Sequence, residues 1–157
     1  MSGGAEFLFD AIIKGDETAV GHLIDLYGSA IITERDENGL SCLHWCAASP
    51  DSERLVPNFI FYGAHIDSRD HLGNAPLHSF CARGCGYGVA CLLNHGADVN
   101  IQNGSEQDTP LHIATKHKND DIARLLLAFG ARSNIKNASG DSPLDLGLLE
   151  LLKVEAS

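Results

Sequence analysis

The chain repeats itself with a period of 33 to 34 residues, and this period restricts its fold more than any other feature. Two dipeptides, Leu-His and Gly-Ala, recur and stay in phase over three copies. Leu-His begins at residues 43, 77 and 111, and Gly-Ala at residues 63, 96 and 130. A fourth copy of the first pair reads Leu144-Asp145. The pattern predicts an array of short units, each of which buries its apolar residues against its neighbours.

Each unit carries the signals of two short helices that follow a turn. Thr109 is a candidate N-cap, and Pro110 stands in the first helical turn, where its missing N–H costs no hydrogen bond. The run "IARLLLAFG", residues 122–130, has apolar residues at helical spacing and ends on a glycine. The equivalent positions in other units are Ser41, Pro76, Ser142 and Pro143.

These units resemble the ankyrin repeat, which opens on Thr-Pro-Leu-His-x-Ala and closes on Gly-Ala-Asp-x-Asn. The segment "DTPLHIA", residues 108–114, matches the opening, and "NHGADVN", residues 94–100, matches the close. The resemblance covers roughly residues 5–150. It implies an all-α solenoid of stacked helix-turn-helix units with short β-turn fingers. It also implies that the repeated His bridges backbone groups of its own turn and the neighbouring one.

We expect residues 1–157 to form a single ankyrin-repeat domain. We expect a partial repeat at each end of the chain. The N-terminal cap has two helices around the Lys14-Gly15 turn. The C-terminal cap has a first helix from about Ser142 and no full second helix. The predicted units span residues 5–35, 36–69, 70–103, 104–136 and 137–157. In the unit at 36–69 we expect the second helix to be irregular or to start late, because Pro57 falls inside it.

Composition excludes several functions. Eleven basic and 21 acidic residues give a net charge of −10, which opposes binding to nucleic acids and anionic membranes. No apolar run approaches the length of a membrane span. The five cysteines are odd in number and unevenly spaced, which favours reduced thiols in the cytoplasm or nucleus. We expect a monomer without a cofactor.

The stretch "SCLHWCAA" looks like half of a metal site, because Cys42, His44 and Cys46 are zinc-type ligands. Cys81 and Cys85 repeat the spacing of the two thiols. The repeat explains these residues differently: the imidazole occupies the repeated His position, and two of the thiols fill positions of small buried Ala. We therefore expect no metal site, and keep a cysteine-based metal or redox sensor as the weaker alternative.

Cys85 is the one cysteine with features of a reactive thiol, since it begins a helix beside Arg83, where a thiolate is favoured. The surrounding "GCGYG" lacks the spacing of a nucleotide-binding loop and reads as a turn between helices. No nucleophile-and-base arrangement stands outside the repeat pattern. We predict no enzymatic activity.

The resemblance implies that the chain binds another protein or peptide, as an adaptor or regulator, through a concave groove of turn tips and first helices. Leu40 and Leu72 are apolar residues on polar turn tips, and such residues often mark contacts. Trp45 is the only Trp and is either an anchor in the groove or part of the core. The other candidate contact residues are Glu37, Asn38, His71, Asn74, Arg83, Asp108, Lys116 and His117.

The acidic net charge favours a partner whose surface is neutral to basic. An alternative is that the chain is the targeting or regulatory ankyrin domain of a larger enzyme or scaffold, because its last unit lacks a full second helix.

Overall fold

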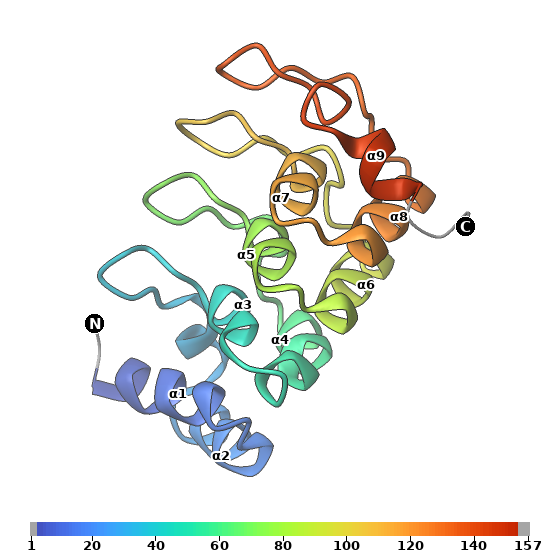
Figure 1. The fold of residues 1–157 in the computed structure, drawn as a ribbon. Helices are drawn as coiled ribbons and strands as arrows, with labels where there is room; N and C mark the ends of the chain where they lie inside the picture. The colour runs from blue at the N-terminus through green and yellow to red at the C-terminus, as the bar shows by residue number, and fades with distance from the viewer. Residues whose placement is uncertain (1–2, 154–157) are drawn as a thin grey trace.

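A computed structural model describes residues 3–153 of the chain. Helix pairs stack side by side into an elongated solenoid, and hairpin-like loops project from one side of it (Figure 1). The residues described here form helices and turns and contain no strand. This confirms the all-α solenoid that the resemblance to ankyrin repeats implied.

The helices form two rows (Figure 1). The first helices of the pairs are α1 (Gly3–Ile13), α3 (Cys42–Trp45), α5 (Pro76–Arg83) and α7 (Pro110–Lys116). The second helices are α2 (Glu17–Tyr27), α4 (Val56–Phe61), α6 (Gly86–Asn94) and α8 (Asp120–Ala128), followed by α9 (Leu148–Leu152). Three 3-10 turns are η1 (Ser29–Thr33), η2 (Cys46–Ala48) and η3 (Ser52–Leu55).

The N-terminal pair has the predicted turn between its helices. Asp16 caps α2 by accepting a hydrogen bond from the backbone N–H of Ala19 at 2.9 Å. Gly15 has a φ of +64°, and a Cβ on it would lie 2.8 Å from the Cβ of Asp51. Glycine is therefore required at this turn, both for its backbone conformation and for the close approach of the next unit.

The second pair is irregular, as the position of Pro57 predicts. α3 has only four residues and continues into η2. The second helix begins as the 3-10 turn η3 and becomes α-helical at Val56. Pro57 thus lies in the first turn of α4, where a proline removes no helical hydrogen bond.

The predicted helix from Ser142 is wrong. Residues 143–147 form hydrogen-bonded turns, in which the N–H of Leu146 donates to the carbonyl of Ser142 at 3.1 Å. Gly147 then adopts a left-handed φ of +92°, and α9 begins after it. Since a left-handed residue ends a helix, too few residues separate Ser142 from Gly147 for a regular α-helix.

One apolar core runs through all the stacked pairs. The leucines of the Leu-His pairs, Leu43, Leu77 and Leu111, are completely buried. Cys46 and Cys81 are also buried, which confirms that they pack as small apolar residues. Burial raises the pKa of both thiols, so they stay protonated.

The glycine-rich stretch "GCGYG" is a helix boundary and not a nucleotide loop. Gly84 ends α5 in the left-handed conformation, with a φ of +75°. Gly88 lies in α6 against the buried ring of Phe80, and a Cβ on it would come within 2.1 Å of that ring. The absence of a side chain at Gly88 therefore allows α5 and α6 to pack closely.

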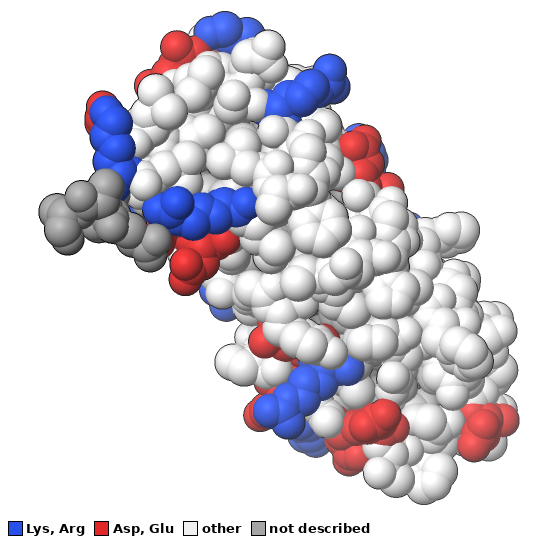
Figure 2. All heavy atoms as spheres, turned by 90° about the vertical axis from the view of Figure 1, so that its right-hand side faces the viewer, with Lys and Arg blue, Asp and Glu red and all other residues white. Residues whose placement is uncertain are grey.

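Figure 2 shows the side of the second helices, where charged side chains gather towards the two ends and a wide uncharged area lies between them. None of the helices within residues 3–153 is long and apolar enough to cross a membrane.

We predict that Gly88→Ala lowers the free energy of unfolding by about 1–3 kcal/mol, because the added methyl group overlaps the ring of Phe80. Gly86→Ala is the matched control, since nothing lies within 4 Å of a Cβ at that position. The control should be neutral or stabilise by up to about 1 kcal/mol. Urea unfolding of both variants measures the difference; equal effects would contradict the packing account.

Candidate partner-binding surface

Four turns project from the row of first helices (Figure 1). We call them the fingers, and they comprise residues 36–40, 70–74, 103–108 and 137–141. In each finger the N–H of the first residue donates to the carbonyl of the last, at 2.9 to 3.1 Å. The first residue is Asp or Asn, whose side chain also accepts backbone N–H groups of its own turn.

Backbone hydrogen bonds join each finger to the next. The N–H of His71 donates to the carbonyl of Asn38 at 2.9 Å, and the N–H of Gly104 donates to the carbonyl of Leu72 at 3.2 Å. A third bond links the last two fingers at 2.8 Å. Because their backbones are tied in this way, the finger tips present their side chains from a fixed support.

A second set of ties was missed by the sequence analysis. Arg35 donates from Nη1 to the carbonyl of Gly39 in its own finger, at 3.0 Å, and to the carbonyl of Arg69, at 3.2 Å. Arg69 repeats the pattern one unit later, and Gln102 does so through its side-chain amide. The three residues occupy the same position of the repeat, so the period could have revealed them.

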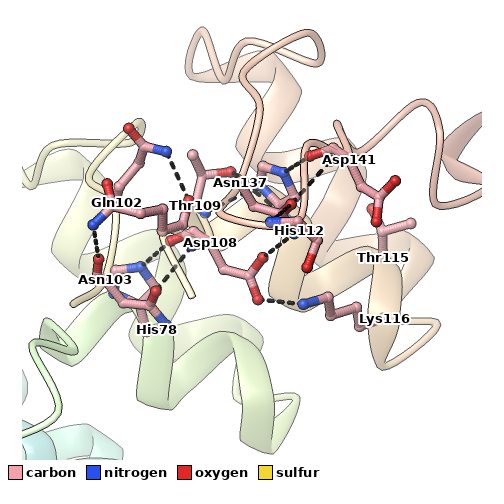
Figure 3. Close-up of polar contacts among 12 residues, drawn as sticks. His78, Gln102, Asn103, Asp108, Thr109, His112, Thr115, Lys116, Asn137 and Asp141 are labelled. Carbon is pink, nitrogen blue, oxygen red and sulfur yellow. Dashed lines mark hydrogen bonds and ion pairs between the residues drawn. The ribbon is translucent and has the colours of Figure 1, made fainter. Parts of the chain in front are cut away.

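The repeated imidazoles join consecutive units, as the resemblance implied. Nδ1 of His78 accepts the N–H of Ala75 at 3.1 Å, and its Nε2 donates to the carbonyl of Asp108 at 3.0 Å. Because Nδ1 accepts, the neutral ring carries its proton on Nε2. His44 and His112 make the same pair of bonds in their own units, the latter to Asp141 (Figure 3).

These histidines are therefore structural. Burial lowers the pKa of His44 and of His78, which keeps both rings neutral. Within residues 3–153, no three His, Cys, Asp or Glu side chains are grouped so that they could hold a metal ion.

Asp108, predicted as a contact residue, lies inside the molecule. Its Oδ1 accepts a hydrogen bond from Nδ2 of Asn137 at 2.8 Å, and its Oδ2 forms an ion pair with Lys116 (Figure 3). Asn74 holds the same place one unit earlier and accepts from Asn103 at 3.1 Å. Asp108 is only 2% exposed, so it connects fingers and is not available to a partner.

Trp45 lies between the core and the surface. Its indole stacks on Phe9 of α1, with ring centroids 5.5 Å apart and an interplanar angle of 26°. Its Nε1 is buried and has no hydrogen-bond partner among the described residues. The same side chain also lines a hollow of about 240 Å³ between α3 and α5. The indole thus packs against α1 and also lines the hollow, and its role as an anchor for a partner stays a prediction.

The lining of this hollow is mostly apolar. A second, adjoining hollow of about 150 Å³ lies between α5 and α7. Ser79 lines both, and we call the two together the concave groove. Arg83 is the only Lys, Arg, Asp or Glu among their lining residues. The first hollow is lined by Leu40, His44, Trp45, Ala47, Ala48, Ser79 and Arg83, and the second by Asn74, His78, Ser79, Ala82 and Ile113.

The remaining candidate residues lie outside the hollows. Leu72 is 70% exposed on a finger tip. Other exposed candidates are Glu37, Asn38 and His71 on the fingers, and Lys116 and His117 at the end of α7. The structure therefore brings Leu40, Trp45 and Arg83 together around one hollow and places Asn74 in the adjoining one.

Cys85 lacks the environment expected of a reactive thiol. Burial raises the pKa of Cys85, the carboxylate of Glu53 raises it further, and Arg83 opposes these effects only in part. The expected stabilisation of the thiolate is therefore wrong, because Glu53 approaches from the preceding unit.

The sequence analysis also missed exposed aromatic residues at the end of α4. Phe61 is 84% exposed and packs edge-to-face on Tyr62, with ring centroids 5.4 Å apart. Tyr62 directly precedes a Gly-Ala marker, as Phe129 does two units later. The repeat could thus have drawn attention to this position.

Comparisons with known proteins agree with the repeated architecture. A family profile described as "Ankyrin repeats" matches in three copies over residues 43–137. Human Ankyrin repeat and SOCS box protein 9 is 42% identical over 86 residues, which cover 52% of this chain and 27% of the relative. Human Rabankyrin-5 is 30% identical over 129 residues, which cover 75% of this chain and 11% of Rabankyrin-5. Putative palmitoyltransferase ZDHHC13 of Danio rerio is 30% identical over 125 residues, which cover 79% of this chain and 19% of that relative. The matches thus span only a small part of each relative.

We predict that the free energy of unfolding decreases between pH 7 and pH 5. Unfolded His binds a proton near about pH 6.5, whereas buried His78 does so only at lower pH, so the unfolded state gains protons first. In His78→Gln, which cannot titrate, the decrease should be smaller. Urea unfolding at pH 7, 6 and 5 measures it; equal decreases would show that this ring does not contribute.

We predict that Asp108→Ala lowers the free energy of unfolding by about 1–3 kcal/mol, because Asn137 loses its buried acceptor. Asp108→Asn should cost less, since the amide retains Oδ1 and since Asn74 fills the same place in the preceding unit. Thermal unfolding of both variants tests the internal role. Stability equal to wild type in the Ala variant would contradict it.

Proposed function

The chain belongs to the ankyrin repeat family, and from this premise we propose that it binds a partner protein or peptide in its concave groove. One observation carries the proposal: an open, apolar hollow lies beside the only Trp of the chain, under a row of fixed fingers. Ankyrin repeats serve as protein–protein interaction modules, and an apolar hollow with polar borders suits that use.

The scaffold favours binding because its groove is formed before a partner arrives. The finger ties and the histidine bonds hold the first helices and the turns together. Little conformational entropy remains to be lost by the module on association. The side chain of Trp45 is also held in place before binding, because its indole stacks on Phe9.

We assign the main contacts to Trp45, Leu40 and Leu72. A rigid aromatic in a hollow is the kind of residue that dominates binding energy, and the two leucines extend its apolar surface. Asp108 is omitted because its carboxylate is engaged internally. The surrounding contacts are Glu37, Asn38, His71, Asn74, Arg83, Lys116 and His117.

We further propose that the module acts as a monomer without catalysis or cofactor, in the cytoplasm or nucleus. Its five cysteines are free, and four of them are buried, which suits a reducing compartment. Neutral to basic partners are favoured at long range by the net charge of −10.

A second candidate function is that of a targeting or regulatory domain within a larger enzyme or scaffold. It is favoured by the length of the relatives, of which the matches cover 11 to 27%, and by one relative whose name is that of a putative palmitoyltransferase. The concave groove would bind in the same way in either setting. Sequencing of the full transcript distinguishes the two.

We predict that Trp45→Ala weakens binding of a partner captured from cell lysate by about 2 kcal/mol, or roughly 30-fold in Kd. Leu72→Ala should weaken binding without a change in stability, because that side chain is 70% exposed. Tyr87→Ala, on α6 outside the groove, is the control and should bind as wild type does. Isothermal titration measures all three; unchanged affinity in both groove variants would refute the assignment.

A further inference from the structure

We propose that the concave groove selects a partner segment with an acidic side chain beside a large apolar one. The acidic group pairs with Arg83, and the apolar group packs on Trp45 and Leu40. This inference rests on the proposed function and deepens it by naming the chemistry of the bound segment.

The groove differs in charge from the protein as a whole. The chain carries −10, yet none of the residues that line the two hollows is acidic. Several nearby carboxylates are engaged within the protein: Asp36 and Asp70 accept backbone N–H groups of their own fingers, and Asp108 pairs with Lys116. Glu53 accepts the N–H of Gly88 at 3.0 Å, and Glu37 is exposed on its finger tip and does not line either hollow. Arg83 is therefore the only Lys, Arg, Asp or Glu side chain that lines the groove itself.

That cation, Arg83, is exposed at the C-terminal end of α5 and forms no hydrogen bond or ion pair within residues 3–153. Other arginines of the repeat are occupied, since Arg35 and Arg69 donate to finger carbonyls. A free guanidinium presents a planar pair of donors that matches a carboxylate. Beside an apolar wall, such a pair is screened less by water than one on an open surface.

The hollow places the two binding groups side by side. Ala48 and Ser79 are among its lining residues, and their small side chains leave the space of about 240 Å³ open. Trp45 and Arg83 line the same hollow, so one segment meets both at once. The second hollow continues the groove past Ala82 towards Ile113, which favours an extended segment over a single inserted group.

A basic segment is the competing occupant, because an indole face also attracts cations. Arg83 opposes that occupant, since a like charge in the same hollow repels it. The net charge acts at longer range and favours a partner that is neutral or basic overall. Together, the two effects favour a partner segment that carries an isolated Asp or Glu and is otherwise neutral or basic.

The test is a selection of random 12-residue peptides displayed on phage, fused at both ends so that only side chains supply carboxylates. Wild-type protein should enrich peptides with Asp or Glu close to a large apolar residue. Arg83→Glu should lose this preference and enrich Lys or Arg instead. The selected peptides are then synthesised with a fluorescent label, and their binding is measured by anisotropy.

Arg83→Gln should weaken the labelled peptides by about tenfold or more. Arg54→Gln is the matched control, because Arg54 is also exposed but lies on η3 and does not line the groove. Ser79→Trp fills both hollows and should abolish binding. Circular dichroism and unfolding midpoints establish that each variant is folded.

The outcomes separate this inference from the proposed function. In one outcome the selected peptides lack acidic residues and bind Arg83→Gln as tightly as wild type, yet fail to bind Ser79→Trp. That result would overturn the charge preference and leave groove binding intact. Peptides that bind Ser79→Trp as well as wild type would overturn both. A selection that enriches nothing above a protein-free control would also overturn both.

Discussion

The hydrogen bonds of the repeated imidazoles hold the units of this protein in one register. Each ring accepts an N–H of its own helix start and donates to the last carbonyl of the finger in the next unit, at 2.9 to 3.0 Å. The position of each finger relative to the neighbouring first helix follows from this bond. Since the concave groove lies between first helices and beside the fingers, its shape depends on the same three rings.

Architecture also determines the chemistry of the groove. Acidic side chains are numerous in the chain, but none lines the groove, and Asp36 and Asp108 close or join the fingers. What remains in the first hollow is a mostly apolar lining, an indole stacked on Phe9 and the guanidinium of Arg83, which forms no hydrogen bond or ion pair within residues 3–153. A strongly acidic protein thus has a groove whose only charged lining residue is an arginine.

Much of the fold follows from the period, because residues at the same position of successive repeats have equivalent packing partners. The buried Leu-His pairs and the late start of α4 at Pro57 were both predictable. The rest depended on contacts between units. The sequence predicts Asp108 as a surface residue because it does not show that Asn137 reaches the carboxylate. The effect of Glu53 on Cys85 is equally hidden in the sequence. Groove binding by Trp45, Leu40 and Leu72 remains a prediction.

Acrylamide quenching of the fluorescence of Trp45, with and without a bound partner protein, tests groove binding most directly. Trp45 is the only Trp of the chain, so a Trp-free partner peptide leaves a signal from the groove alone. We predict that the bound partner reduces the quenching constant, since it covers the side of the indole that Phe9 does not. An unchanged quenching constant at saturating partner would contradict the account.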